Sequence, residues 1–149
     1  MRVASSKGFA GVWTPLVKSR PVRARLLPAA SAGEHVVLFR TPDGTPAALP
    51  DQCPHRGVRL SLGRLTPNGC IECAFHGWQF DRAGENQRVP LPADAKRQRL
   101  GAEAFPVREL GALIRLYTGH DPAQDPTVPD ALVNRDVSRT YVGRDWNVH

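Results

Sequence analysis

The sequence predicts an all-β fold, built as an antiparallel sandwich or barrel. Two observations carry this prediction. The apolar segments are short, and signals for tight turns separate them at close intervals along the chain. Short strands at this spacing are typical of antiparallel all-β domains.

The first clear strand is the apolar run at residues 36–40. The Pro-Asp-Gly turn at 41–45 follows it, and residues 45–49 are expected to form its hairpin partner. Asn68-Gly69 is a second strong turn signal. Later elements are the strands at 71–73 and 77–80, a hairpin turn at 81–85, and a strand pair at 105–110 and 112–117 around Gly111.

Length and composition predict one compact domain of 149 residues with a net charge of +6. No run of about eighteen apolar residues is present, so we expect no membrane-spanning helix. The first seven residues lack the apolar stretch of a signal peptide. We therefore expect a cytoplasmic protein with no membrane partner. The domain is expected to occupy residues 1–120, and the Pro- and Asp-rich segment at 121–130 to begin a linker.

Two fragments carry the chemistry, Cys-Pro-His-Arg-Gly at residues 53–57 and Cys-Ala-Phe-His-Gly-Trp at residues 73–78. Together Cys53, His55, Cys73 and His76 offer two sulfur and two nitrogen ligands, which suit zinc or an iron–sulfur centre. Structural zinc sites usually group like ligands, whereas each fragment here mixes the two types. A Rieske [2Fe–2S] centre needs two Cys on one iron and two His on the other. The mixed spacing favours this cluster, and a zinc-stabilised interaction module is the less favoured alternative.

The interval between the fragments supports two facing loops. Residues 56–72 are long enough for a strand, a turn and a returning strand, with Asn68-Gly69 at the turn. Gly57 and Gly77 allow the backbone to adopt angles closed to other residues and to pass near a cluster. Backbone amides in such loops can donate hydrogen bonds to cluster sulfurs, which tunes the potential.

From about Gly11 to Tyr117 the chain resembles the N-terminal Rieske domain of ring-hydroxylating and related Rieske non-haem iron oxygenases. The double Cys/His motif carries most of the resemblance. The flanking residues that support it are Trp13, Pro15, residues 37–40, residues 60–63, Phe80-Asp81, Gly84 and Val89-Pro90. The chain departs from the family pattern at Ala74, where Pro is frequent, and at Arg115, where Trp is common.

The resemblance implies a Rieske-type β fold in which the two loops form a small cluster-binding subdomain. It implies one [2Fe–2S] cluster, with Cys53 and Cys73 on one iron and His55 and His76 on the other. Arg56 and Trp78 are implied to cover the cluster. No catalytic residue is expected in this chain.

The implied function is electron transfer, as the oxidoreductase N-terminal part of an aromatic-ring-hydroxylating type of dioxygenase or monooxygenase. The implied electron donor is a ferredoxin or a flavin- and NAD(P)H-dependent reductase. The mononuclear Fe(II) would lie in a catalytic domain, of which residues 121–149 would hold only the linker and the start, so this chain alone is not expected to hydroxylate a substrate. An intact oxygenase could be a homo-oligomer. The alternative is a stand-alone Rieske ferredoxin.

The remaining cysteine and histidines are not expected to bind metal. Cys70 is interpreted as a small apolar strand residue, and no even set of cysteines is left for disulfides. His35, His120 and His149 are scattered, which excludes the facial arrangement of a mononuclear iron site.

Two basic runs are present, Lys18, Arg20, Arg23 and Arg25 in the first and Lys96, Arg97 and Arg99 in the second. They are interpreted as solvated surface, with steering of an acidic reductase or ferredoxin as the alternative. No aromatic residues interleave them, so nucleic acid is not an expected partner.

The neighbours of the ligands predict a low redox potential. Respiratory-type Rieske proteins resemble this pattern but add one Cys in each loop, and Val58 and Ala74 leave no such pair here. The residue after the second His-Gly is Trp78, which has no hydroxyl to donate to a bridging sulfide. With fewer donors the reduced cluster is less stabilised, so we expect a potential near the low end of the range of about −150 to +300 mV.

Overall fold

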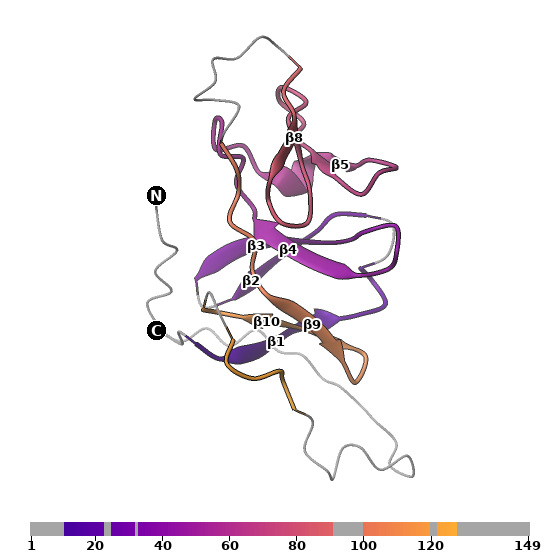
Figure 1. Cartoon of the computed structure of the whole chain (residues 1–149), viewed down its shortest axis with the longest axis vertical. Helices are drawn as coiled ribbons and strands as arrows, with labels where there is room; N and C mark the ends of the chain where they lie inside the picture. The colour runs from indigo at the N-terminus through magenta and orange to yellow at the C-terminus, as the bar shows by residue number, and fades with distance from the viewer. Residues whose placement is uncertain (1–10, 23–24, 32, 91–99, 120–121, 128–149) are drawn as a thin grey trace.

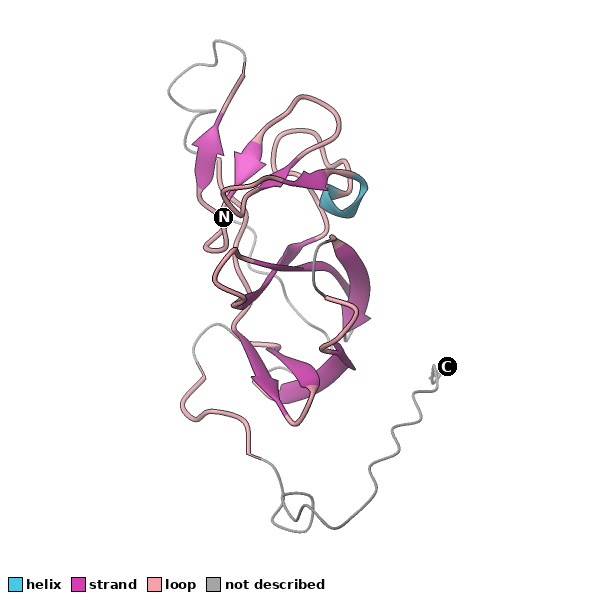
Figure 2. Cartoon of the chain, turned by 90° about the vertical axis from the view of Figure 1, so that its right-hand side faces the viewer, coloured by secondary structure: helices cyan, strands magenta, loops and turns pink. Residues whose placement is uncertain are grey.

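The computed structural model describes residues 11–22, 25–31, 33–90, 100–119 and 122–127. This part of the chain folds into three small antiparallel sheets that are stacked along the long axis of the molecule (Figures 1 and 2). The all-β prediction is therefore confirmed.

The sheet at one end contains, in spatial order, β1 (Trp13–Lys18), β10 (Leu113–Tyr117) and β9 (Val107–Leu110). The middle sheet contains β2 (Leu27–Ser31), β3 (Glu34–Arg40) and β4 (Pro46–Pro50). The sheet at the other end contains β5 (Arg64–Leu65), β6 (Ile71–Glu72), β7 (Gln79–Phe80) and β8 (Asn86–Arg88), and the short 3₁₀ helix η1 (Leu60–Leu62) precedes it.

The middle sheet is apolar on both faces because it separates two cores. Successive side chains of a strand point to opposite faces. On β3, Val37 and Phe39 pack toward the sheet that carries the two Cys/His loops, and Val36 and Leu38 pack toward the opposite sheet. All four side chains are fully buried. This double burial is the physical reason for the unbroken apolar run at residues 36–39, which Arg40 ends.

Three predicted turns, at 41–45, at Asn68-Gly69 and at 81–85, share one backbone pattern, which spans residues 66–70 in the second. In each, the first residue's N–H donates to the carbonyl of the fifth, and the glycine at the fourth position donates to the carbonyl of the first. The three glycines, Gly44, Gly69 and Gly84, have φ values of 83°, 82° and 79°. A left-handed residue at this position is typical of three-residue hairpin loops, so these turn predictions are confirmed.

Two strands, β1 and β2, were not indicated by the sequence. Pro15 and Pro28 interrupt them, and a proline cannot donate to a strand ladder. Both strands lie at the edge of their sheets, where that missing donor is tolerated. Strand β1 pairs with β10, from the other end of the domain, with an irregular register between Pro15 and Val17.

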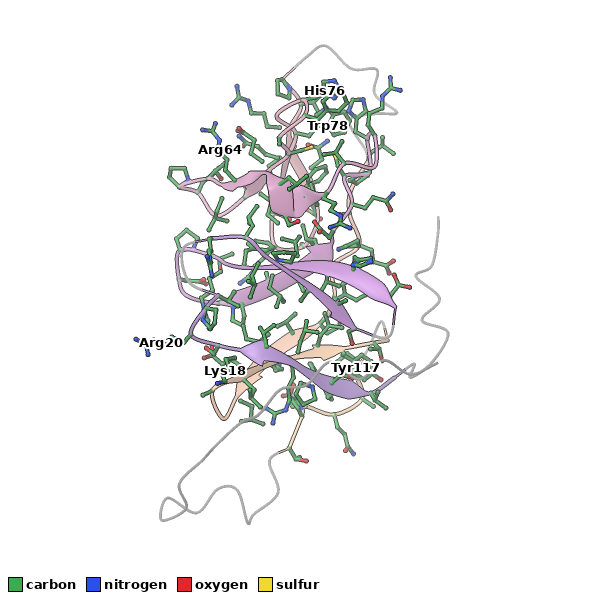
Figure 3. All side chains as sticks on the ribbon, turned by 180° about the vertical axis from the view of Figure 1, so that it is seen from behind. Lys18, Arg20, Arg64, His76, Trp78 and Tyr117 are labelled. Atoms are coloured by element: carbon green, nitrogen blue, oxygen red, sulfur yellow. The ribbon has the colours of Figure 1, made fainter. Side chains whose placement is uncertain are left out.

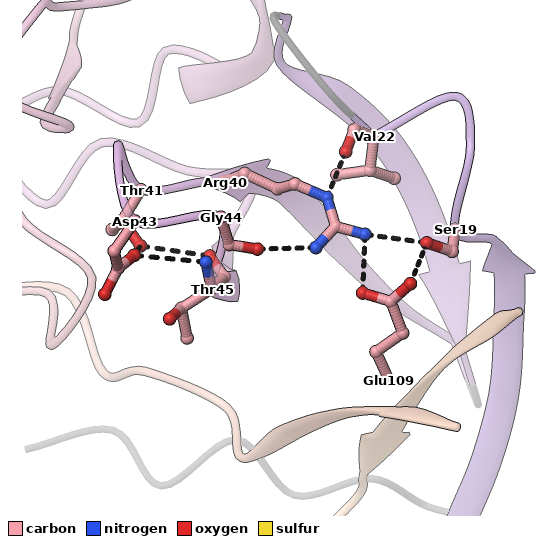
Figure 4. A network of polar contacts seen from close by, with 8 residues as sticks. All are labelled: Ser19, Val22, Arg40, Thr41, Asp43, Gly44, Thr45 and Glu109. Atoms are coloured by element: carbon pink, nitrogen blue, oxygen red, sulfur yellow. Dashed lines mark hydrogen bonds and ion pairs between the residues drawn. The ribbon is translucent and has the colours of Figure 1, made fainter. Parts of the chain in front are cut away.

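An arginine at the end of β3 joins the middle sheet to the sheet that contains β9 (Figure 4). The Arg40 guanidinium donates to the carbonyls of Val22 at 2.5 Å and Gly44 at 2.6 Å, and to the Ser19 hydroxyl at 2.7 Å. It also pairs with the Glu109 carboxylate at 2.7 Å, and the Ser19 hydroxyl donates to the same carboxylate. The contacts with Val22, Ser19 and Glu109 link the end of β3 to the segment after β1 and to β9, whereas the contact with Gly44 stays within the β3–β4 turn.

Parts of the sequence-based expectations lie outside the described residues: Arg23, Lys96, Arg97, Arg99, His120, and the segment 128–149 with His149. Residues 122–127, the described part of the expected linker, contact the sheet formed by β1, β10 and β9. The Trp13 indole donates to the Gln124 carbonyl at 2.7 Å, and Arg108 pairs with Asp125 at 2.8 Å. The described residues contain no helix long and apolar enough to cross a bilayer.

Candidate metal centre

The two Cys/His fragments form loops with the same backbone frame. The first, residues 53–57, follows β4, and the second, residues 73–77, connects β6 to β7. In the first loop, the Cys53 N–H donates to the Val58 carbonyl at 2.8 Å, and the Gly57 N–H donates to the Cys53 carbonyl at 2.8 Å. In the second loop the bonds run from Cys73 to Trp78 at 2.8 Å and from Gly77 to Cys73 at 3.0 Å. Two six-residue segments are therefore closed in the same way.

A glycine in the left-handed region makes each loop possible. Gly57 has φ 75° and Gly77 has φ 68°, values that other residues rarely adopt. At Gly77 space is short as well, because a Cβ would lie 3.2 Å from the Pro90 ring. The predicted role of these two glycines in shaping the loops is confirmed.

The histidines occupy different places in otherwise matching frames. His55 is the second residue after its cysteine and His76 is the third. Even so, the fold brings them together, with imidazole centroids 4.9 Å apart. A Cys-x-His loop and a Cys-x-x-His loop thus present their imidazoles side by side.

The cysteines lie deeper than the histidines. Cys53 is 2% exposed and Cys73 is 3% exposed, and both belong to the core between the middle sheet and the loop-bearing sheet. The Cys73 thiol helps to raise the pKa of Cys53, so the two thiols are neighbours. His55 and His76 are only partly buried. The site therefore has an inner pair of sulfurs and an outer pair of imidazoles, all four within the two predicted loops.

Burial disfavours the thiolate form of Cys53, so a bound cation would be required to stabilise that form. Burial raises the pKa of the Cys53 thiol to about 11, the Cys73 thiol adds to this rise, and the backbone N–H groups of His55 and Arg56 act against it. A cysteine binds metal as the thiolate, and a bound metal ion removes the proton outright. Backbone donors already face the sulfur that would carry this negative charge.

This donor set fits a binuclear cluster. A [2Fe–2S] cluster requires only two protein ligands on each iron, with two thiolates on one and two imidazoles on the other. The inner sulfur pair and the outer imidazole pair match that requirement.

Aromatic rings fix the position of both imidazoles. Trp78 stacks on His55, with ring centroids 4.5 Å apart and ring planes 9° from parallel. Phe75 lies against His76, with centroids 3.9 Å apart. Trp78 is 3% exposed and packs in the core, whereas Phe75 is 58% exposed. One imidazole is thus held by a buried ring and the other by a ring at the surface.

A buried carboxylate that the sequence did not single out braces the first loop. Asp51 is 6% exposed and accepts hydrogen bonds from the Ser61 N–H and the Ser61 hydroxyl, both at 2.7 Å. These bonds tie the start of the loop to the 3₁₀ helix that follows it. Nearby, Gly63 lets the backbone pass Glu72, since a Cβ would lie 2.0 Å from the Glu72 carbonyl oxygen. No spacing rule identifies Asp51, because its partner is defined only by the fold.

Cys70 and His35, which were predicted to have no metal role, lie outside the loops at residues 53–57 and 73–77. Cys70 is buried just before β6, its backbone N–H bonds the Thr66 hydroxyl, and burial raises the pKa of its thiol. His35 is exposed on β3. Figure 3 shows Lys18 and Arg20 toward the end of the molecule opposite His76 and Trp78. Lys18 and Arg20, the two residues of the first basic run that the figure labels, therefore do not border the two loops.

Comparisons with known proteins match the same region. The sequence model of the Rieske [2Fe-2S] domain matches residues 12–106. The 3-chlorobenzoate-3,4-dioxygenase oxygenase subunit of Comamonas testosteroni is 34% identical over 116 residues, which is 72% of this chain and 26% of that protein. The oxygenase component of dicamba O-demethylase from Stenotrophomonas maltophilia is 42% identical over 109 residues, which is 72% of this chain and 32% of that protein.

Solved structures agree. A crystal structure of dicamba monooxygenase with non-haem iron and dicamba superposes with a TM-score of 0.73 at 36% identity, and the match covers 84% of this chain and 39% of that one. The oxygenase of a carbazole 1,9a-dioxygenase, in complex with its ferredoxin, matches with a TM-score of 0.70 at 28% identity, covering 79% and 31%. This chain spans about a quarter to two fifths of the length of these relatives.

Proposed function

The chain belongs to the family of Rieske [2Fe–2S] domains, and we propose that it carries electrons as the Rieske part of an oxygenase. The observation that supports this most directly is the inner pair of thiols beside the outer pair of imidazoles, with His55 and His76 4.9 Å apart. In this proposal Cys53 and Cys73 hold one iron, and His55 and His76 hold the other. When bound, the cluster accepts and releases one electron.

The chain's own residues would perform three tasks. The buried cysteines exclude water from the inner side of the site, because the surrounding core is apolar. The backbone N–H groups of His55 and Arg56 face the Cys53 sulfur and stabilise its negative charge. The partly exposed imidazoles form the outer side, where an electron can enter or leave over a short distance.

The oxygenase relatives suggest where the electron goes. A relative is described with non-haem iron and dicamba, and another with a ferredoxin. We propose that this chain receives its electron from a ferredoxin or a flavin- and NAD(P)H-dependent reductase and passes it to the mononuclear iron of a catalytic domain, in a dioxygenase or monooxygenase. Its place of action is proposed to be the cytoplasm.

Metal analysis and spectroscopy of the purified chain test the cluster assignment. We expect two irons and two acid-labile sulfides per chain, and a rhombic electron paramagnetic resonance (EPR) signal after reduction with dithionite. We expect a midpoint potential near the low end of the Rieske range, about −150 mV, because no hydroxyl follows Gly77. A colourless protein loaded with zinc would refute the assignment. A midpoint potential well above zero would refute only the prediction of a low potential and would leave the cluster assignment intact.

A further inference from the structure

The two loops and their flanks carry three arginines and an exposed aromatic ring. The loops and their flanks, residues 53–60, 73–78 and 86–90, contain Arg56, Arg59 and Arg88 and no carboxylate. All three arginines are exposed. The exposed aromatic ring is Phe75, 58% exposed and in contact with His76.

These residues lie in or next to the two loops that carry the imidazoles. Arg56 directly follows His55 in the first loop, and Arg59 follows Val58, whose carbonyl closes that loop. Arg88 lies on β8 opposite Gln79, and the chain then reaches Pro90, which lies against Gly77 of the second loop. Loop closure and strand pairing therefore place all three arginines in or next to the two loops of the proposed site.

Two described carboxylates that adjoin the loops have other hydrogen-bond or ion-pair partners. Asp51 is buried against Ser61. Glu72, the carboxylate near Arg88, is already held by Arg64 at 2.7 Å and by Gln79 at 2.7 Å. Within the described residues, none of the ion pairs involves Arg56, Arg59 or Arg88.

We propose that Phe75, Arg56, Arg59 and Arg88 form the docking surface for an acidic electron-donor protein. This inference rests on the proposed electron-transfer function and adds the site and the charge of its partner. Charge complementarity steers the encounter and fixes its orientation. The exposed Phe75 ring provides an apolar contact that excludes water beside His76. Lys18 and Arg20, toward the other end of the molecule, lie outside this surface (Figure 3).

The test measures how fast a reduced, strongly acidic [2Fe–2S] ferredoxin reduces the full chain, by stopped flow at several salt concentrations. The variants are Arg59→Glu and Arg88→Glu, singly and together. Arg56 is left unchanged because its backbone N–H faces the Cys53 sulfur. The matched control is Arg20→Glu, which makes the same change of charge at the distant site.

We expect the wild-type rate constant to fall steeply with salt, and the double variant to be about tenfold slower than wild type at low salt. Arg20→Glu should change the rate less than twofold, and a ferredoxin with amidated carboxylates should abolish the differences. A rate that is independent of salt, or equal slowing by Arg20→Glu, would overturn the proposal. A third result would also overturn it: the double variant loses self-association, while the rate of its reduction by ferredoxin does not change. The surface would then bind a second copy of this chain and not an electron donor.

The dithionite-reduced EPR signal of each variant separates the two proposals. If the wild-type chain lacks the signal, the cluster assignment fails. If every variant keeps the signal and the rates do not change, only the docking surface fails.

Discussion

The imidazole of His55 lies flat against the indole of Trp78, with centroids 4.5 Å apart and planes 9° from parallel. The contact crosses from the first ligand loop to the end of the second. Trp78 is 3% exposed and belongs to the same core as Phe39, Leu49 and Phe80. One buried ring therefore anchors the second loop in the core and limits rotation of a proposed ligand in the first.

This contact predicts a large cost for removing the indole. We expect Trp78→Ala to lower the free energy of unfolding by about 3–5 kcal/mol, as for other buried aromatic residues. Trp78→Phe should lose less and keep the EPR signal, because a ring still faces His55. The control is Phe75→Ala, an exposed site that should change stability by about 0.5 kcal/mol or less. Urea denaturation measures all three, and equal losses at positions 75 and 78 would contradict the assigned anchoring role.

The ligand assignment predicts opposite outcomes for two substitutions. Cys53→Ala should lose the cluster and loosen both loops, since it removes a thiolate from the inner pair. His76→Cys should keep a cluster but move its potential toward the about −400 mV of all-cysteine ferredoxins, because thiolate donates more electron density than imidazole. EPR and potentiometric titration measure both. A Rieske signal that survives in Cys53→Ala would show that another residue is the ligand.

Two glycines with nearly the same backbone angles should differ in their tolerance of alanine. Gly44 has φ 83° and open space around it, whereas a Cβ on Gly84 would lie 1.7 Å from the Ala102 carbonyl oxygen. Gly44→Ala should cost about 1–2 kcal/mol from the left-handed angle alone. Gly84→Ala should cost at least about 2 kcal/mol more, because backbone must move and overpacking adds to the strain. Thermal or urea unfolding of the two variants gives the difference directly, and similar losses would show that the chain segment over Gly84 yields easily.

The Arg40 network predicts a dependence of stability on pH. The Ser19 hydroxyl, and then the Arg40 guanidinium, hold the pKa of Glu109 below its ordinary value of 4.5. A carboxyl group whose pKa is depressed by folding stabilises the protein fully above its unfolded value, and this contribution is lost as the pH falls through the folded value. The loss attributable to Glu109 should therefore appear below about pH 4.5.

Comparison of wild type with Glu109→Gln isolates this effect, because every other titrating group is common to both. At neutral pH the variant should be less stable by about 1 kcal/mol, a modest value because Glu109 is partly exposed. The difference should shrink as the pH is lowered below about 4.5 and the carboxylate takes up a proton. A difference that is constant with pH would show that packing, and not charge, is responsible.

Much of the fold could be read from local signals. The turns at 41–45, 66–70 and 81–85 depend on a glycine that takes a positive φ, and this requirement is visible in a few consecutive residues. Strands β1 and β2 could not be read, because their prolines are tolerated only at a sheet edge, and edge position depends on the partner strand. Pairing of β1 with β10 joins residues about a hundred positions apart, which no local pattern encodes.

The sequence alone determined the chemistry of the proposed site. Cys53, His55, Cys73 and His76 are recognisable because metal binding needs particular donor atoms at short spacing within a loop. Tertiary structure decided how these donors are arranged. The thiols are buried on the inner side of the site, and the imidazoles lie side by side on the outer side. Trp78 stacks on His55, and Asp51 braces the first loop. The tertiary structure also showed that arginines from separate segments lie in or next to the two ligand loops, while Lys18 and Arg20 lie toward the opposite end. Donor type is a property of single residues, whereas burial, stacking and the sharing of a surface depend on which segments the core brings together.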